Sequence, residues 1–238
     1  RPEQFEIDDL LSLPNVEKGK WSPLAGRITK AAGSSTKPGD IDVVKENRVG
    51  VQDEGSQLVA LGLVNAKVSG PESHWLDMCA GPGGKAAILA GFAAEKNADF
   101  TAIEPTPARA KLVENSLNHA PGNYEVVVTD AREFESTELF DRILVDAPCT
   151  GLGALRRRPE ARWRKQPSDI PPLTKLQTEL LAKAATLVKS GGVIGYATCS
   201  PHIAETDAVV NDFLKKHPDF VLQDISPVLA QLNLPEGT

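Results

Sequence analysis

The sequence predicts an α/β fold in which a mostly parallel sheet is covered by helices on both faces. From residue 74 onward, short apolar runs alternate with segments long enough to form helices, the pattern of successive strand, helix and strand units. The first apolar run leads into a glycine-rich loop directly before a helical segment. The apolar fraction of 41%, together with 19 glycines in 238 residues, matches a folded globular chain.

The elements follow in order from their periodicity. A first helix is expected over residues 52–64, because Leu58, Leu61 and Val64 share one face. Asp53 and Glu54 lie in its first turn, where the helix dipole favours acids. Strands are then expected at 74–78, 98–103, 124–128, 142–145, 193–197 and 220–222, and helices at 84–95, 106–119, 173–189 and 201–216.

The first 47 residues lack this regular pattern and predict an accessory segment, with loop-like composition over 33–39. The chain begins with Arg1 without an apolar leader, so we expect an N-terminal portion of the protein to be missing. The longest stretch without charged residues, 190–204, has 15 residues and is too short for a membrane span. Three cysteines separated by 70 and 50 residues suit neither a disulfide framework nor a metal site, and they indicate a reducing cytoplasm.

Acidic side chains stand at or beside the ends of four successive predicted strands: Asp77, Glu104, Asp130 and Asp146. In parallel sheets, ligands bind beyond the carboxyl ends of the strands. A single acid there could be an ordinary solvated loop residue, but four together indicate a site. Glu104 lies 20 residues beyond the glycine loop, where a carboxylate binds a ribose diol. The loop alone is compatible with a nicotinamide enzyme, although it lacks the G-x-G-x-x-G order.

Two further cysteines follow the fourth and fifth predicted strands, in Asp146-Ala147-Pro148-Cys149-Thr150-Gly151 and Thr198-Cys199-Ser200-Pro201. Free cysteines are often buried structural residues. Here both thiols are predicted at the same sheet edge as the glycine loop. Ser200 and Pro201 are suited to begin a helix, so the sequence predicts Cys199 at a positive helix end, where a thiolate is favoured.

The glycine loop and the two cysteine loops resemble, in order and spacing, the signature motifs of the Sun/RsmB family of bacterial ribosomal RNA cytosine-5 methyltransferases. Residues 50–59 are also similar to the segment just ahead of that family's catalytic domain. The resemblance covers about residues 50–210 and implies a class I, Rossmann-like methyltransferase fold with S-adenosylmethionine as cofactor. It divides the chain into an accessory segment, 1–47, at the end of an RNA-recognition region, and a catalytic domain, 48–238, whose final hairpin is expected to be truncated.

The resemblance also implies roles for individual residues. Glu104 would bind the ribose hydroxyls, Asp130 would lie by the adenine, and Asp146 would lie between the cofactor and the target base. Cys199 would be the nucleophile, and Cys149 would assist release of the product. The loop that would line the methionine moiety is Cys79, Ala80, Gly81, Pro82, Gly83, Gly84 and Lys85. Gly81 stands where alanine is common in the family, and we expect function to survive this change.

A thiol is needed because C5 of cytosine is a poor nucleophile. Addition of a thiolate to C6 makes an enamine that can attack the methyl sulfonium, so covalent catalysis divides one hard step into easier ones. Asp146, if protonated or sharing a proton with N3, would stabilise the charge that develops in the ring. The base that afterwards removes the C5 proton is Cys149 or a water that it orients.

One short segment concentrates positive charge in a chain of net charge −6. Residues 156–165 hold six basic residues and one acid, and they directly follow the first cysteine loop. Such runs are often merely solvated, but this position favours contact with RNA phosphates. The candidate RNA-binding residues are Arg156, Arg157, Arg158, Arg162, Trp163, Arg164 and Lys165, with Trp163 either stacking on a base or filling a crevice.

The sequence thus predicts a cytoplasmic, monomeric enzyme that methylates cytosine C5 in small-subunit ribosomal RNA before the subunit is fully assembled, without a metal or a membrane. Two alternatives remain open at this point. One is the same reaction on transfer RNA, and the other is a non-catalytic RNA-binding assembly factor that retains the fold.

Overall fold

A computed structural model describes residues 5–29 and 37–231 of the chain. Its centre is a five-stranded parallel sheet in the order β5-β4-β3-β6-β7. The strands are β3 (His74–Asp77), β4 (Asp99–Ile103), β5 (Tyr124–Val127), β6 (Phe140–Asp146) and β7 (Val188–Ala197). The predicted α/β class, a parallel sheet of Rossmann-like order, is therefore confirmed. The strand order reverses between β3 and β6, and a ligand crevice forms at such a switch point.

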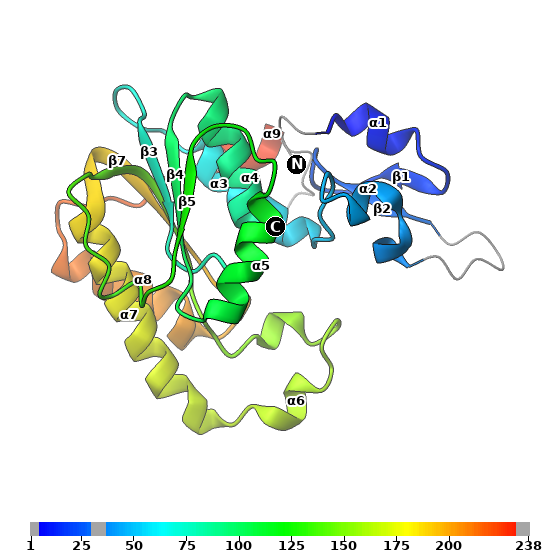
Figure 1. Cartoon of the computed structure of the whole chain (residues 1–238). Coiled ribbons are helices and arrows are strands. Elements are labelled where there is room, and N and C mark those ends of the chain that lie inside the picture. Colours follow the sequence, from blue (N-terminus) through cyan, green and yellow to red (C-terminus); the bar gives the residue numbers. More distant parts are fainter. Residues whose placement is uncertain (1–4, 30–36, 232–238) are drawn as a thin grey trace.

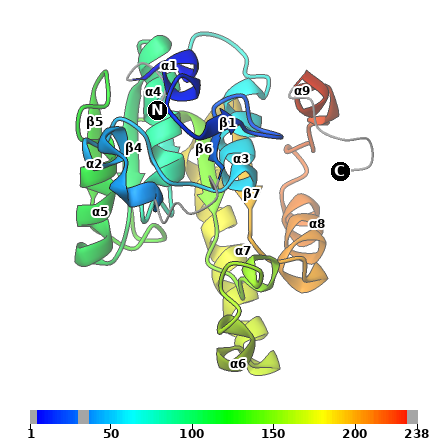
Figure 2. The same ribbon diagram turned by 90° about the vertical axis from the view of Figure 1, so that its right-hand side faces the viewer.

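Helices cover both faces of the sheet (Figures 1 and 2). On one face lie α3 (Glu54–Asn65), α4 (Gly84–Glu95) and α5 (Pro107–Leu117), and on the other lie α7 (Ile170–Leu187) and α8 (Asp207–Lys216). Two main apolar clusters result, one around Trp75, Leu89 and Phe100, and one around Leu76, Ile143 and Leu180. Residues of both clusters come from adjacent positions on β3, as expected for a strand that is buried on both sides.

The accessory segment contains more regular structure than its sequence pattern indicates. It holds α1 (Ile7–Leu11), the antiparallel pair β1 (Val16–Lys18) and β2 (Gly26–Ile28), and the short helix α2 (Asp42–Lys45). Glu54 of α3 anchors it by accepting hydrogen bonds from the backbone N–H groups of Trp21 (2.6 Å) and Ser22 (2.9 Å). The Ser22 hydroxyl in turn donates to Gln57 on the next turn of α3. This segment therefore packs against the first helix of the domain.

Helix α7 and strand β7 differ from the predicted boundaries. Helix α7 begins at Ile170, three residues before the predicted start, because Pro171 and Pro172 occupy its first turn, where a missing N–H breaks no helical hydrogen bond. It ends at Leu187, and β7 follows at once from Val188, so residues predicted as the last helical turn are extended.

The strand predicted at residues 220–222 is wrong. Phe220 instead packs on Phe213 of α8, with ring centroids 5.1 Å apart, and Val221 is 82% exposed. The side chain of Gln223, and not a backbone ladder, exchanges hydrogen bonds with the backbone of Lys67. A short helix, α9 (Ser226–Gln231), follows.

A buried arginine ties α3 to the sheet. Arg142 of β6 is 4% exposed and binds Glu72 through two hydrogen bonds, of 2.6 and 3.0 Å. It also donates to the backbone oxygens of Leu63 and Ala66 at the end of α3. These contacts satisfy the orphan carbonyls of a helix terminus with a charged donor.

Of the helices that the structure describes, none is both long and apolar enough to cross a bilayer.

Candidate active site

The predicted site residues meet at the carboxyl edge of the sheet. Asp77 and Asp146 are the last residues of the neighbouring strands β3 and β6, and Glu104 directly follows β4. Cys149 and Cys199 lie in the loops after β6 and β7. These residues thus lie at the carboxyl edge of the sheet, as predicted, and the strand order places the switch point between β3 and β6.

The loop after β3 depends on Gly83, which caps α4 with φ of 107°. This left-handed backbone conformation strains any residue with a side chain. A Cβ at this position would also lie only 2.5 Å from Cβ of Ser116 on α5. Helix α4 therefore packs closely on α5, and its free N–H groups face the loop.

Gly81 lies against the carboxylate that is predicted to bind ribose. Glu104 is 1% exposed, accepts a hydrogen bond from the backbone N–H of Thr106 (3.0 Å) and pairs with Arg109 at 3.3 Å. Arg109 also donates to the backbone oxygen of Gly81 (2.8 Å). A Cβ on Gly81 would overlap Oε2 of Glu104. The missing side chain of Gly81 thus leaves room for the Glu104 carboxylate to lie against the loop, and the loop and acid fit S-adenosylmethionine.

Two other acids of the edge differ in environment. Burial raises the pKa of Asp77 to about 7, and the Asp146 carboxylate adds to the rise. Asp130 lies three residues beyond the end of β5, in the loop that follows the strand. There Arg132 binds both of its oxygens, at 3.0 and 2.6 Å, and holds the pKa of Asp130 below its usual range. Asp130 thus lies near the carboxyl edge of the sheet in an ion pair with Arg132.

The two predicted catalytic thiols are in contact. Sγ of Cys149 lies 3.3 Å from Sγ of Cys199, although 50 residues separate them in sequence. Cys199 is exposed and Cys149 is half-buried. Cys79, the third cysteine, begins the cofactor loop and packs against the apolar cluster around Leu76, and burial raises the pKa of its thiol. Cys149 and Cys199 therefore form a dithiol pair that can share one proton.

The environment places that proton on Cys149. A hydrogen bond from Cys149 lowers the pKa of Cys199 to about 6, against the effects of desolvation and of the Asp146 charge. The pKa of Cys149 is raised by the same hydrogen bond and by burial. The more exposed sulfur carries the negative charge, which water can solvate. Cys199 is thus the better nucleophile at neutral pH.

Lys85 adds a positive charge at the same place. Its ammonium group, from the first turn of α4, donates to Oδ2 of Asp146 at 2.6 Å. Both charges act on the thiol pair, since Asp146 raises and Lys85 lowers the pKa of Cys199. The predicted cofactor loop and the predicted base-binding acid are therefore joined directly.

The predicted reason for an acidic Cys199 is wrong. No helix begins at Pro201: a 3₁₀ turn spans Ile203–Glu205, and α8 starts only at Asp207. His202 has an extended backbone, and its Nδ1 accepts a hydrogen bond from the N–H of Ala204, which starts the tight turn in place of an α-helix. The hydrogen bond from Cys149, and not a helix dipole, activates Cys199.

Comparisons with known proteins agree with this geometry. A family model described as 16S rRNA methyltransferase RsmB/F matches residues 67–235. The chain belongs to this family. It is 50% identical over 235 residues to the candidate methyltransferase Rv1407 of Mycobacterium tuberculosis, covering 98% of this chain and 50% of that protein. It is 36% identical over 185 residues to ribosomal RNA small subunit methyltransferase B of Sodalis glossinidius, covering 76% of this chain and 41% of that protein.

A solved structure, that of PH0851, superposes on 90% of this chain and on 48% of its own chain, with a TM-score of 0.79 and 29% sequence identity. The chain spans about half the length of these curated relatives. Membership in the RsmB/F family makes S-adenosylmethionine the cofactor and removes the nicotinamide alternative.

In this RsmB/F family member, the basic segment extends from the domain beyond the first cysteine loop (Figures 1 and 2). It includes the short helix α6 (Ala161–Arg164), and Trp163 is 79% exposed, so this ring fills no crevice. Arg157 forms an ion pair of 2.9 Å with Asp53 at the start of α3. Within the described ranges 5–29 and 37–231, no ion pair involves the other five cations, Arg156, Arg158, Arg162, Arg164 and Lys165.

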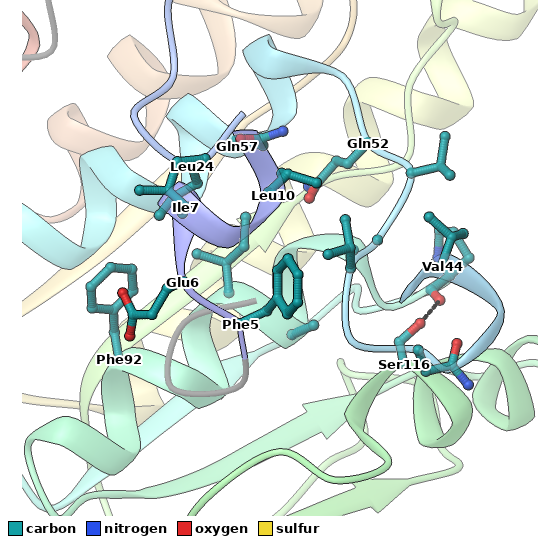
Figure 3. A pocket seen from close by; sticks show the side chains of 18 of the residues that line it. Phe5, Glu6, Ile7, Leu10, Leu24, Val44, Gln52, Gln57, Phe92 and Ser116 are labelled. Atoms are coloured by element: carbon teal, nitrogen blue, oxygen red, sulfur yellow. Dashed lines mark hydrogen bonds between the residues drawn. The ribbon is translucent and has the colours of Figure 1, made fainter. Parts of the chain in front are cut away.

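A cavity of about 600 Å³ lies between the accessory segment and α4 (Figure 3). Phe5, Leu10 and Phe92 supply much of its apolar wall, and Gly84 of the cofactor loop also lines it.

Among the described residues, no group of three or more His, Cys, Asp or Glu side chains could hold a metal ion.

Two residues at the cysteine loops are not among the predicted site residues. Glu205 is wholly buried and accepts hydrogen bonds from Thr150, and Gln177 of α7 donates to both Pro148 O and Glu205. Neither belongs to the glycine loop or to the two cysteine motifs. The signal in the sequence is a lone acid, Glu205, shortly after Thr198-Cys199-Ser200, but its burial is visible only in the structure.

Proposed function

We propose that this RsmB/F family member transfers a methyl group from S-adenosylmethionine to C5 of a cytosine in small-subunit ribosomal RNA through a covalent adduct with Cys199. The observation that carries the proposal is the thiol pair, in which the two sulfurs lie 3.3 Å apart and the hydrogen bond between them lowers the pKa of Cys199 to about 6. A thiolate at neutral pH is the form that can add to C6 of the ring.

The residues at the edge divide the chemistry among them. Sγ of Cys199 forms a bond to C6, and the electrons of the C5–C6 double bond move into the ring toward N3. The Lys85 ammonium, 2.6 Å from the Asp146 carboxylate, would stabilise this shift of charge, and Asp146 would do so by sharing a proton with N3. When bound, S-adenosylmethionine supplies an electrophilic methyl group to C5. Glu104 and the loop with Gly81 would hold it through ribose and methionine contacts.

Cys149 or a water that it orients would then remove the C5 proton. The electron pair of that C–H bond re-forms the C5–C6 double bond and expels the Cys199 thiolate. The proton that Cys149 holds in the resting pair must first pass to the ring or to water, because only a deprotonated group can act as a base. The free cations of residues 156–165 would bind the RNA phosphates, and Trp163 would stack on a base.

Two variants of the complete gene product test the assignment. Cys199→Ala should abolish both methyl transfer to small-subunit ribosomal RNA and the covalent RNA adduct that survives denaturation. Cys149→Ala should accumulate that adduct, because release fails. If Cys149→Ala abolished the adduct and Cys199→Ala did not, the nucleophile assignment would be wrong. Methylation of transfer RNA in place of ribosomal RNA, or a failure to bind S-adenosylmethionine in calorimetry, would refute the substrate or the catalytic role.

A further inference from the structure

We propose that Glu205 is a positioning residue that holds the two cysteine loops together and thereby sets the contact between the thiols of Cys149 and Cys199. The inference rests on the proposed function in that it concerns the same two cysteines. It adds a residue from a third loop, the 3₁₀ turn Ile203–Glu205, which lies outside the three signature motifs.

The carboxylate of Glu205 binds the loop after β6 directly. Oε1 accepts a hydrogen bond from the backbone N–H of Thr150 (2.8 Å), and Oε2 accepts one from the Thr150 hydroxyl (2.5 Å). The Thr150 hydroxyl lies 3.0 Å from the hydroxyl of Ser200 in the loop after β7. Thr150 follows Cys149 and Ser200 follows Cys199, so one carboxylate organises the residue next to each thiol.

The same carboxylate is tied to the body of the domain. Gln177 of α7 donates to Oε1 of Glu205 at 3.2 Å, and Tyr196 of β7 donates to its backbone oxygen at 2.8 Å. Gln177 also donates to the backbone oxygen of Pro148, at 2.8 Å. Helix α7, strand β7 and both loops therefore converge on one buried acid.

A buried carboxylate is costly unless hydrogen bonds replace its hydration. Burial favours the neutral acid, but hydrogen bonds from Ser200, Thr150 and Gln177 together hold the pKa of Glu205 below its usual range. Within the part of the chain that the structure describes, no Lys, Arg or His forms an ion pair with it. An anion kept in the core by neutral donors acts as a fixed acceptor, which favours one arrangement of the donors around it.

The sheet alone does not hold the thiols in contact. Cys149 lies three residues beyond the end of β6, and Cys199 lies two beyond the end of β7, past the last strand pairing, between Asp146 and Ala197. Beyond this point the loops are joined by the backbone hydrogen bonds from Ala147 N to Ala197 O and from Gly153 N to Cys199 O, both 2.9 Å, and by the Glu205 network. Releasing the network leaves the Sγ to Sγ distance loosely determined.

The test measures how readily the two thiols form a disulfide in the free protein. In exchange with glutathione, the two thiols are oxidised to the Cys149–Cys199 disulfide while one glutathione disulfide is reduced to two glutathione molecules. The equilibrium constant reports how close the sulfurs are held. Glu205→Gln keeps the shape of the side chain but turns a donor toward Thr150 or Gln177, and it should lower the constant about tenfold or more. Peptide mass mapping identifies the linked cysteines.

Asp141→Asn is the matched control. Asp141 is also a buried carboxylate, 2% exposed, but it lies at the opposite end of β6, where it accepts hydrogen bonds from the N–H groups of Ser73 and His74. This change should lower the melting temperature and leave the glutathione constant unaltered. The proposal would be overturned if the equilibrium constant with glutathione fell equally in Glu205→Gln and Asp141→Asn. It would also be overturned if the constant of Glu205→Gln stayed within twofold of wild type.

A second pair of variants covers the case in which Glu205→Gln does not fold. Thr150→Val removes only one hydroxyl donor to the carboxylate and should also lower the constant, whereas Thr150→Ser retains the hydroxyl and should restore it. If Thr150→Val and Thr150→Ser have the same equilibrium constant with glutathione, the positioning role of Glu205 is refuted. These measurements need no RNA, so they remain decisive even if methyl transfer to cytosine is not observed.

Discussion

Replacing Cys149 by alanine removes the donor that lies 3.3 Å from the Cys199 sulfur. The hydrogen bond from Cys149 is the largest influence on the pKa of Cys199, and all influences together lower that pKa from its ordinary value to about 6. Desolvation and the Asp146 charge, which oppose it, remain in the variant, and the Lys85 charge that favours the thiolate also remains. The Cys199 pKa in Cys149→Ala should therefore return to about its ordinary value.

The size of the effect follows from the titration. At pH 7, a thiol with a pKa of about 6 is roughly 90% thiolate, and one with a pKa of about 9 is roughly 1% thiolate, a fall of about 90-fold. The more basic thiolate is also about 20-fold more nucleophilic, since reactivity rises by about 0.4–0.5 logarithmic units per unit of pKa. The rate at pH 7 should thus fall only about fivefold. The midpoint of the pH profile, which moves by about three units, is the sensitive measure.

The assay follows alkylation of the Cys199 peptide by iodoacetamide between about pH 4.5 and 10, with the site located by mass spectrometry. In the wild type the rate should rise through a midpoint near 6 and level off above about pH 7, because the thiolate form is lost as the pH falls through the pKa. Cys149→Ser keeps an O–H donor and should retain most of the shift. An unchanged midpoint in Cys149→Ala, or a wild-type midpoint near 9, would refute the proposed protonation of the pair.

Three further predictions concern the scaffold and the RNA surface. Gly83→Ala forces a side chain into φ of 107° and should destabilise the fold by about 1–3 kcal/mol and weaken S-adenosylmethionine binding; unchanged thermal melting and calorimetry would contradict this. Arg142→Met leaves Glu72 unpaired and should lower the free energy of unfolding, measured in urea, by about 3–5 kcal/mol. A decrease of less than about 1 kcal/mol would show that the ion pair does not stabilise the fold. Gln at both Arg158 and Arg164 should reduce the slope of log affinity against log salt by about 1.4–1.8, whereas an unchanged slope would exclude phosphate contact.

Much of the site could be predicted because parallel strands end at one edge. Once the strands ending near Asp77, Glu104 and Asp146 were assigned, the topology required these acids to meet, and the cysteines in the following loops had to lie beside them. Strand positions are readable because both faces are buried, so apolar residues stand next to one another, at Trp75 and Leu76 of β3 and at residues 143–145 of β6. Gly83 could be assigned to the loop because glycines are typical of tight strand-to-helix turns, and its φ of 107° is a conformation that favours glycine.

Local signals were less reliable where a side chain competed with the backbone. Ser200 and Pro201 predict a helix start, but the His202 side chain caps a 3₁₀ turn instead. Phe220 lies in a strand-like apolar run, yet its ring is held by Phe213 of α8. In both cases a contact made by one side chain outweighed the preference of the segment.

The sequence by itself determined the fold class, the edge at which the chemistry lies, and the residue types available there. Only the tertiary structure decided which of these groups touch: Cys149 with Cys199, Lys85 with Asp146, and Glu205 with Thr150. The location of the shared proton also depends on it, because a pKa is set by burial and by donors within a few ångströms, and these come from residues 50 or more positions apart along the chain. Periodicity and motif spacing carry no information about such distances.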